Sequence, residues 1–437
     1  MWTALLLAAA TAAAGAACWF LRRSASHWAR RGLPYLRPHL LLGNAAGFAL
    51  NRQTCGQVFG ELYARLRGHP LAGIFLLWQP ALLVRDPAIA GRVLVRDFQC
   101  FRDRGHRASD PMLQDLFFLR GDRRWRTLRD SLEPGFGPKG ARHVFFLLDE
   151  MAQRLLKVLE APAERLLELD VYDQMHRFVI DTVGTCAFGV EFESMLNYDC
   201  FVVKKTRRMT SGSLLRRIRK TLVLAVPDAA RAMGVSFLRS GDADVFRWLT
   251  AEIVAHRRRH NVRRNDLMQL LMALAAKEDA GDSPQSETLR LHPPMSNLSR
   301  SCTAPYTFPG TTRLGDGALH LRPGEAPLHI PICALHRDPG YFPQPERFDP
   351  ERFGPDQLAR QTPYSYLPFG AGQRSCLGER LALLLMKTTL ARLLSRYELF
   401  QSPRTEYPAP IDPRLLLLHP KGGLWVKISN RHWLPCD

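Results

Sequence analysis

A cysteine in a glycine-rich loop is the residue of this chain with the clearest chemical potential. The loop reads Phe369-Gly-Ala-Gly-Gln-Arg-Ser-Cys-Leu-Gly378, and a segment whose apolar period predicts a helix follows it directly. Glycines let a backbone pass close to a flat group. Backbone N–H groups at a helix start stabilise an anion, so Cys376 is expected to favour the thiolate, the form that binds metal ions. Arg374 adds a cation or a partner for a carboxylate.

The spacing within this loop resembles the haem-binding signature of the cytochrome P450 superfamily. Its five fixed positions are matched by Phe369, Gly372, Arg374, Cys376 and Gly378. For the other eight of the nine cysteines, a small buried hydrophobic side chain is the better interpretation. The resemblance implies that Cys376 is the axial ligand of haem b, iron protoporphyrin IX, with Phe369, Arg374 and Gly378 as further haem contacts. An axial thiolate favours cleavage of the O–O bond.

Other residues are expected to hold the haem carboxylates. Trp125 and Arg129 are four residues apart and share one face of a predicted helix. By themselves they indicate only a cation beside an aromatic ring on a solvated helix. They resemble the W-x-x-x-R motif of the family, in which both side chains reach the haem propionates. The resemblance adds Arg104, in a loop, and Arg300, in a strand-like segment, as haem contacts. Indole N–H and guanidinium groups suit a buried carboxylate.

A second group of charged residues lies between these contacts and the loop. Glu287 and Arg290 are three residues apart on a predicted helix, and Arg352 lies further along the chain. Such an E-x-x-R pair alone is usually surface chemistry of little energetic value. Taken with the cysteine loop, it resembles the Glu–Arg–Arg triad of the family. The resemblance implies a structural role, in which mutually paired buried charges lock the loop that presents Cys376.

The surrounding segments predict a mainly α fold with small β-sheets, an α+β class. Periodicity indicates a helix near residues 57–67 and strands at 74–78 and 81–84. Residues 178–189 read as a core helix with small residues on one face. The length of 437 residues alone would suggest roughly two or three ordinary domains. The resemblance instead implies a single haem domain over 45–437.

The N-terminus predicts a membrane anchor. Residues 2–21 contain no charged side chain, and about 20 apolar residues are enough for a helix to cross a bilayer. Arg22 and Arg23 follow at once, so the positive-inside rule keeps the C-terminal side in the cytosol. A cleaved signal peptide is the alternative, since small residues offer a cleavage site, but the first three residues lack its positive start. Residues 22–44 are predicted to be a basic, proline-rich linker.

The charge of the chain points to acidic partners. Lys plus Arg exceed Asp plus Glu by 60 − 41 = 19. The basic residues are scattered and form no zinc-finger or RNA-binding signature, which disfavours nucleic acid. Anionic lipid and an acidic redox partner fit better. The odd number of cysteines and their spacing disfavour a disulfide framework or a zinc site. His256 and His260 have metal-ligand spacing, but neighbouring arginines make a solvated basic helix face the better interpretation.

One part of the expected pattern is missing. The family has a long helix with an A-G-x-x-T motif before E-x-x-R, whereas this chain has only the short segment 275–286. Its Ala280-Gly281-Asp282-Ser283 is preceded by charges and followed by Pro284, so a polar loop is predicted. We expect an internal deletion near 275–286, and no distal catalytic residue is identified. A splice form and an incorrect gene model both remain open.

Together these features predict a membrane-anchored haem-thiolate monooxygenase, similar to arthropod microsomal members of the superfamily. Such an enzyme inserts one oxygen atom from O2 into a lipophilic substrate, with electrons from NADPH. No flavin-binding segment is visible, so a separate flavoprotein reductase of the endoplasmic reticulum membrane is implied, with cytochrome b5 as a second candidate partner. The loop 104–119, with Met112, Phe117 and Phe118, is expected either to line the substrate pocket or to supply core aromatics. The alternative function is a truncated relative that binds haem or lipophiles without turnover.

Overall fold

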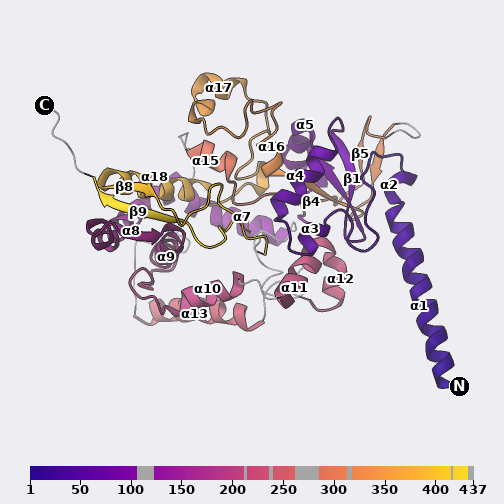
Figure 1. Ribbon diagram of the computed structural model, residues 1–437, viewed down its shortest axis with the longest axis horizontal. Coiled ribbons are helices and arrows are strands. Elements are labelled where there is room, and N and C mark those ends of the chain that lie inside the picture. The colour runs from indigo at the N-terminus through magenta and orange to yellow at the C-terminus, as the bar shows by residue number, and fades with distance from the viewer. Residues whose placement is uncertain are drawn as a thin grey trace. The chain divides into compact units, whose positions relative to one another are not determined.

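The computed structural model describes residues 1–105, 123–210, 214–235, 240–260, 285–312, 317–414 and 417–431 (Figure 1). Helices dominate these residues and the strands are short, which confirms the mainly α class with small β-sheets. The chain divides into two compact units, and each unit draws on separate stretches of sequence. Unit 1 comprises Met1–Trp125, Ser213–Phe237 and Glu287–Ser375, and unit 2 comprises Arg126–Gly212, Leu238–Ser286 and Cys376–Asp437.

Unit 1 combines short helices with the larger sheet. Its helices are α1 (Trp2–Ala25), α2 (His27–Arg30), α3 (Ala46–Ala49), α4 (Cys55–Arg65), α5 (Pro87–Gly91), η1 (Arg92–Arg96), η2 (Phe98–Cys100), α11 (Leu214–Ala225), α12 (Pro227–Ala232), α15 (Gln285–Leu291), α16 (Ile332–Leu335), η4 (Pro350–Phe353), α17 (Pro355–Arg360) and η5 (Gly372–Arg374). Its strands are β1 (Leu71–Leu76), β2 (Gln79–Val84), β4 (Leu298–Ser301), β5 (Tyr306–Phe308), β6 (Leu319–Leu321) and β7 (Pro327–Ile330).

The larger sheet has the strand order β1-β2-β7-β4, and β5 pairs with β6 in a separate hairpin. β1 is buried along its whole length, as expected for a strand that is covered on both faces. β2 runs parallel to β7, and β4 runs antiparallel to β7 with Arg300 opposite Leu328. The strands predicted at 74–78 and 81–84 are therefore confirmed within a few residues, and β4 supplies the strand expected around Arg300.

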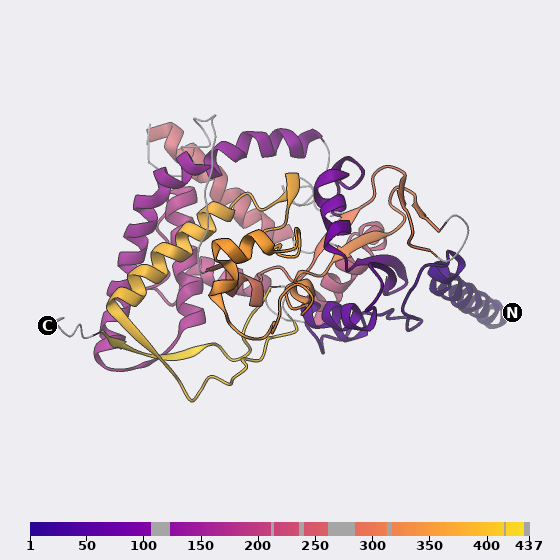
Figure 2. The ribbon, with the colours of Figure 1, turned by 90° about the horizontal axis from the view of Figure 1, so that it is seen from above.

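Unit 2 is a group of long helices with one small sheet. Its helices are α7 (Arg123–Phe136), which begins at the end of unit 1, α8 (Pro138–Glu164), α9 (Val171–Val183), η3 (Gly184–Phe188), α10 (Phe201–Thr210), α13 (Ser240–His260) and α18 (Glu379–Arg396). Strands β3 (Glu168–Asp170), β9 (Trp425–Asn430) and β8 (Tyr397–Gln401) form an antiparallel sheet in that order. α8 and α18 pack along each other, as Figure 2 also shows for the purple and yellow-orange helices.

The N-terminal helix α1 continues beyond the predicted anchor. It runs to Ala25 and places Arg22 and Arg23 in its last turn, where positive side chains suit the helix dipole. No residue of α1 is buried, and its most apolar window has a mean hydropathy of 1.9. Length and composition therefore suit a membrane span, although a signal sequence near the N-terminus would meet the same test.

The segment predicted to be a linker over 22–44 belongs to the core of unit 1. Trp28 is fully buried and its indole Nε1 donates to the carbonyl of Ile74 at 3.0 Å. Gly73 leaves room for this ring, because a Cβ there would lie 2.4 Å from it. The Gly73 amide in turn donates to the carbonyl of Pro34 at 2.8 Å. The globular body thus begins near Trp28, because one buried aromatic side chain outweighs the basic, proline-rich composition around it.

Two other expectations are refined in unit 2. The predicted core helix over 178–189 is α9 followed by the π-helical turn η3, and it ends at Gly189 with φ +65°. In α13, His256 and His260 are exposed with ring centroids 4.6 Å apart, as a solvated face predicts. Arg257 between them is buried and donates to the carbonyl of Phe188 at 3.0 Å, so that face is only partly solvated.

Two predictions fall on residues that the structure does not describe. Most of the loop 104–119, including Met112, Phe117 and Phe118, lies beyond the described residue 105. The predicted deletion near 275–286 lies almost entirely before the next described residue, Gln285. Both stay predictions from the sequence.

Candidate haem site

The glycine-rich loop is fixed by a close approach of two backbone segments. Gly370 and Gly372 have φ values of +77° and +70°, which glycine adopts without strain. A Cβ on Gly372 would lie 2.2 Å from the carbonyl oxygen of Leu94 in η1. The group that lies close to Gly372 is therefore protein backbone. The sequence predicts instead that the glycines of this loop let the backbone pass close to a flat group. Phe369 is half-buried at the start of this loop.

Cys376 is exposed and lies just before α18. The helix takes Gly378 as its N-cap residue, whose carbonyl accepts the Ala382 amide at 2.9 Å. The predicted position at a helix start is thus found, with Cys376 slightly outside the first turn. An accessible sulfur before a helix N-terminus is suited to bind an iron ion as thiolate.

Arg374 is buried against an aromatic ring in unit 1. Its guanidinium carbon lies 4.1 Å from the ring centroid of Trp125, and both side chains are buried. The Trp125 ring also lies beside Phe98, at 6.1 Å between centroids. Nη2 of Arg104 donates to the carbonyl of Arg374 at 3.2 Å. Trp125, Arg104 and Arg374, predicted from three distant parts of the sequence, are therefore brought together.

Arg300 completes this arginine cluster, which we define as Arg104, Arg300 and Arg374. Arg300 is 1% exposed, and Nη1 donates to the carbonyl of Ser299 at 2.8 Å. Its Nε has no hydrogen-bond partner among the described residues. Burial, together with the positive charges of Arg104 and Arg374, lowers the pKa of Arg300 to about 9. A lowered pKa means that the folded protein disfavours the charged form of this side chain.

The arginine cluster fits the carboxylates of haem. A buried cation is costly unless an anion pairs with it, and here the nearest charges that act on Arg300 are positive. A group with two carboxylates would supply the missing negative charge and accept hydrogen bonds from guanidinium N–H groups. This observation concerns unit 1 alone. In the sequence, Cys376 lies two residues after Arg374, a member of the cluster.

Arg129 is engaged differently from the other predicted contacts. It lies on α7 four residues after Trp125, as expected, but belongs to unit 2. Its Nη2 lies 3.9 Å from Oε1 of Glu133 on the same helix. The exposed Glu133 carboxylate can release it at little cost, because exposed ion pairs are weak. The role of Arg129 toward haem stays a prediction.

The predicted triad contains a fully buried ion pair. Glu287 and Arg290 are both 0% exposed, and the guanidinium donates twice to the carboxylate, at 2.7 and 2.8 Å. Arg290 also donates to the carbonyls of His336 and Pro345, each at 2.8 Å. The amide of Asp349 donates to Glu287 at 2.9 Å. Such extensive pairing compensates for taking both charges out of water.

Arg352 lies farther from the Glu287 carboxylate than Arg290 does. Its Nε lies 3.6 Å from Oε1 of Glu287, which is an ion pair beyond hydrogen-bond distance. Its Nη2 donates to the carbonyl of Gln344 at 3.0 Å. The structure thus brings the predicted charges together, with the Glu287–Arg290 pair as the tight part and Arg352 at its edge.

Two residues beside the predicted contacts carried no signal in the sequence. Ser299 donates its hydroxyl to the carbonyl of Arg104 at 3.0 Å and so joins β4 to the loop of Arg104. Phe98 packs on Trp125. A serine in a strand and a phenylalanine in a short helix are common, so only the folded chain distinguishes them.

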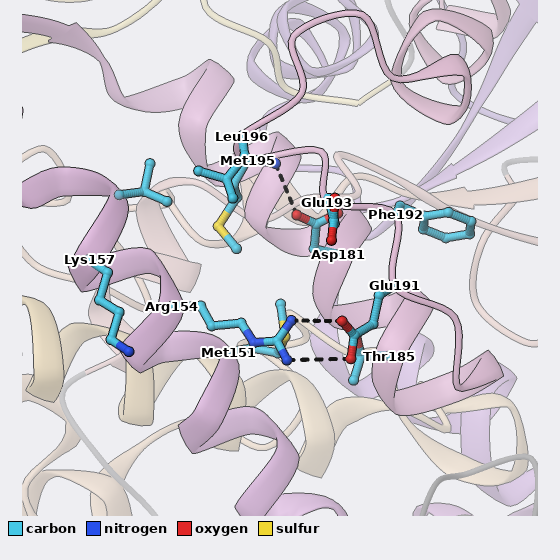
Figure 3. Close-up of a pocket in the computed structure, with 11 residues that line it drawn as sticks. Met151, Arg154, Lys157, Asp181, Thr185, Glu191, Phe192, Glu193, Met195 and Leu196 are labelled. Atoms are coloured by element: carbon cyan, nitrogen blue, oxygen red, sulfur yellow. Dashed lines mark hydrogen bonds and ion pairs between the residues drawn. The ribbon is translucent and has the colours of Figure 1, made fainter.

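A separate pocket of about 230 Å³ lies in unit 2, between α8, the end of α9 and the loop after η3 (Figure 3). On its wall, Arg154 pairs with the Glu191 carboxylate at 3.1 Å. The Asp181 carboxylate accepts the amides of Ser194 and Met195 at 2.8 and 2.9 Å. These charges are engaged by their neighbours, and none of the predicted haem contacts lines the pocket. It is not part of the candidate haem site.

Comparison with known families identifies the family of this chain. The family model described as Cytochrome P450 matches residues 33–286 and 282–426. The chain belongs to the cytochrome P450 family. This cytochrome P450 is accordingly a haem-dependent monooxygenase, and the expected fold is that of its family. The two matched segments meet at residues 282–286, inside the region where a deletion is predicted.

Several relatives of this cytochrome P450 come from insects. It is 27% identical to cytochrome P450 6A1 of Musca domestica, with 97% of each chain covered. It is 28% identical to cytochrome P450 6a2 of Drosophila melanogaster, with 93% of this chain and 96% of the relative covered. The alignment with the Musca protein spans 504 positions, more than the 437 residues of this chain, and therefore includes gaps. The predicted resemblance to arthropod members is confirmed.

Replacing Arg300 by methionine should weaken haem retention and spare the haem-free protein. Methionine keeps an unbranched side chain, although a shorter one, and removes a cation on which two other positive charges act, so the haem-free protein should unfold at the same or a higher temperature. Loss of a charge-assisted hydrogen bond should weaken haem affinity on the order of 10- to 100-fold. Haem content after gel filtration and thermal unfolding would measure the two effects.

The matched control is Arg322→Met, because Arg322 is an exposed arginine of the same unit. It should change neither quantity. If Arg300→Met retained haem like the wild type, the arginine cluster would not bind the haem carboxylates.

Proposed function

We propose that this cytochrome P450 inserts one oxygen atom from O2 into a lipophilic substrate, of xenobiotic, hormone or fatty-acid type, with electrons from NADPH. The observation that carries the proposal is the arginine cluster, in which Arg300 is buried among positive charges and Arg374 stands two residues before Cys376 in the glycine-rich loop. Haem b held by the Cys376 thiolate would supply the oxygen chemistry, because a thiolate ligand favours cleavage of the O–O bond.

The side chains of this chain then bind and orient that cofactor. Cys376 would hold the iron through its thiolate. Arg104, Arg300 and Arg374 hold the carboxylates, with Trp125 and Arg129 as further donors. Phe369 and Gly378 complete the contacts of the loop. The exposed position of Cys376 supports access to a ligand, and the burial of Arg300 and Arg374 supports the exclusion of water from the carboxylates.

The triad acts on the site through the backbone. Glu287 and Arg290 fix the segment around Pro345 and His336, and Arg352 adds a longer ion pair at the edge. Because a buried pair cannot lose one partner without leaving an unpaired charge, this arrangement has a single low-energy geometry. We propose that this rigidity holds the loop that presents Cys376.

The electron donor proposed is a separate NADPH-dependent flavoprotein reductase, with cytochrome b5 as a second partner. The net charge of +19 supports an acidic docking partner, because complementary charge steers association. Anionic lipid at the membrane surface fits the same charge. Nucleic acid is not proposed as a partner.

The proposed location is the endoplasmic reticulum membrane, with the haem domain in the cytosol. The support is the apolar helix α1 with Arg22 and Arg23 in its last turn.

Deleting residues 2–21 should move the chain from the membrane fraction toward the soluble fraction, with some residual attachment through basic residues. Protease added outside sealed microsomes should digest the body of the full chain. Protection of that body would contradict the orientation.

Cys376→Ala should abolish haem retention or move the Soret band away from the thiolate position, because no thiolate would remain at the end of the loop. Cys376→Ser, which keeps the size, should behave nearly as badly. The reduced, carbon-monoxide difference spectrum measures both. Cys200→Ala is the control, since that cysteine is buried outside the loop. An unchanged spectrum in Cys376→Ala would refute the assignment.

The alternative function is a catalytically impaired chain that binds haem or lipophiles without turnover. It is favoured by the meeting of the two family matches at 282–286 and by the gapped alignment. In the family pattern, the helix with A-G-x-x-T supplies a hydroxyl near the oxygen, and no equivalent is identified in this sequence. A misplaced proton donor typically costs about 10²- to 10⁴-fold in rate.

Insertion of a family-like helix with A-G-x-x-T before Glu287 should therefore raise coupled product formation by a similar factor. The inserted and original chains would be compared in matched membranes with excess reductase. Peroxide release, measured in parallel, should fall on insertion. Equal coupled turnover by the two chains would show that the deletion is tolerated.

A further inference from the structure

His336 links the buried ion pair of the triad to the loop that precedes Cys376. It is 0% exposed and caps the C-terminus of α16. Its Nε2 accepts the backbone amide of Leu367 at 2.8 Å, and its Nδ1 lies 3.2 Å from the carbonyl oxygen of Arg290. Leu367 stands two residues before Phe369, where the haem-binding loop begins.

These contacts define one neutral tautomer of His336. Nε2 faces an N–H donor, so it carries no proton, and the ring proton lies on Nδ1 and points to the Arg290 carbonyl. Burial is the main reason that the pKa of His336 falls to about 3, and the positive charges of Arg290 and Arg337 lower it further. The imidazole therefore stays neutral and keeps one donor and one acceptor in place.

Neighbouring groups fix the ring and its backbone. Nη1 of Arg290 donates to the His336 carbonyl at 2.8 Å, so the two residues exchange hydrogen bonds in both directions. The imidazole stacks on Tyr366, with ring centroids 5.1 Å apart and planes inclined by 29°. Phe342 approaches it edge-on at 6.2 Å. The acceptor of the Leu367 amide therefore has a fixed orientation, because these neighbours prevent rotation of the ring.

We propose that His336 is a positioning residue for the haem-binding loop. Its two hydrogen bonds hold the Leu367 amide at a fixed position relative to the Glu287–Arg290 pair. This position determines the direction of the backbone between Leu367 and Cys376. The inference deepens the proposed function and rests on Cys376 as the haem ligand. The Leu367 amide can be measured without haem, so the two ideas can be tested apart.

Three substitutions separate the two hydrogen bonds of His336. His336→Phe keeps a ring but loses both bonds. His336→Gln keeps a carbonyl oxygen at about the reach of Nε2 and can accept the Leu367 amide. His336→Asn keeps an amide group near the position of Nδ1 and can donate to the Arg290 carbonyl, but it does not reach Leu367. The matched control is His329→Phe, because His329 is another buried histidine of unit 1 whose ring contacts Asn297 and Phe59.

The first measurement is hydrogen exchange of the Leu367 amide in the haem-free chain. Loss of a buried acceptor should speed this exchange on the order of 10- to 100-fold in His336→Phe and His336→Asn. His336→Gln and His329→Phe should stay near the wild type. If exchange at Leu367 were the same in all variants, or fast in the wild type, the inference would be overturned.

The second measurement is the reduced, carbon-monoxide difference spectrum of the haem-loaded variants. In His336→Phe and His336→Asn, part of the haem should lose its thiolate ligand, so the thiolate-type Soret band should decrease and the band of haem without thiolate should increase. In His336→Gln the thiolate-type band should stay near the wild type. A role in stability alone would lower total haem content in proportion to unfolding without changing this ratio, and that outcome would contradict the proposal. If His336→Phe fails to fold, the comparison of His336→Gln with His336→Asn tests the proposal. A wild type without a thiolate band would refute the proposed function, while Leu367 exchange would still judge the role of His336.

Discussion

The burial of Arg300 beside other positive charges is the constraint on which the candidate site depends. Arg300 is almost completely buried, and the charges of Arg104 and Arg374 act on it to lower its pKa. A folded protein does not keep such a cluster at low cost unless an anion joins it. The same unit buries Glu287 with Arg290 as a complete pair, so the two clusters differ in kind. The Glu287–Arg290 pair is satisfied within the protein, whereas the charges that act on Arg300 are positive. We propose that haem carboxylates supply the negative charge at Arg300.

We propose that the Glu287–Arg290 pair makes the glycine-rich loop rigid. Arg290 binds backbone carbonyls on the segment after α16, and His336 extends this arrangement to Leu367. From there the chain passes Gly372, which has room only because it lacks a Cβ beside the Leu94 carbonyl. Arg374 follows, packed on Trp125, and then Cys376. The loop is therefore constrained at successive points by a hydrogen bond, a backbone contact and a cation–π contact, and each acts on a different residue.

Motifs with fixed spacing could be predicted from the sequence, whereas contacts between distant segments could not. Cys376 stands in a pattern of five fixed positions, and Glu287 with Arg290 becomes informative only together with that pattern. The fold class follows from membership in the family. The sequence around Trp28 predicts a linker, because the partner of its indole, Ile74, lies 46 residues away in β1. His336 gave no signal, because a buried histidine is recognised by its two backbone partners and not by its neighbours in sequence. The helix α1 extends past the predicted anchor because Arg22 and Arg23 stay helical despite their charge.

The central claim is that the arginine cluster and Cys376 hold one haem. An experimental structure of the haem-loaded chain, at a resolution that shows the carboxylate groups, tests this most directly. The account predicts the Cys376 sulfur bonded to iron, and haem carboxylate oxygens hydrogen-bonded to Arg300 with Arg104 or Arg374 beside them. A haem bound through another axial residue, or with its carboxylates in solvent and away from Arg300, would contradict it.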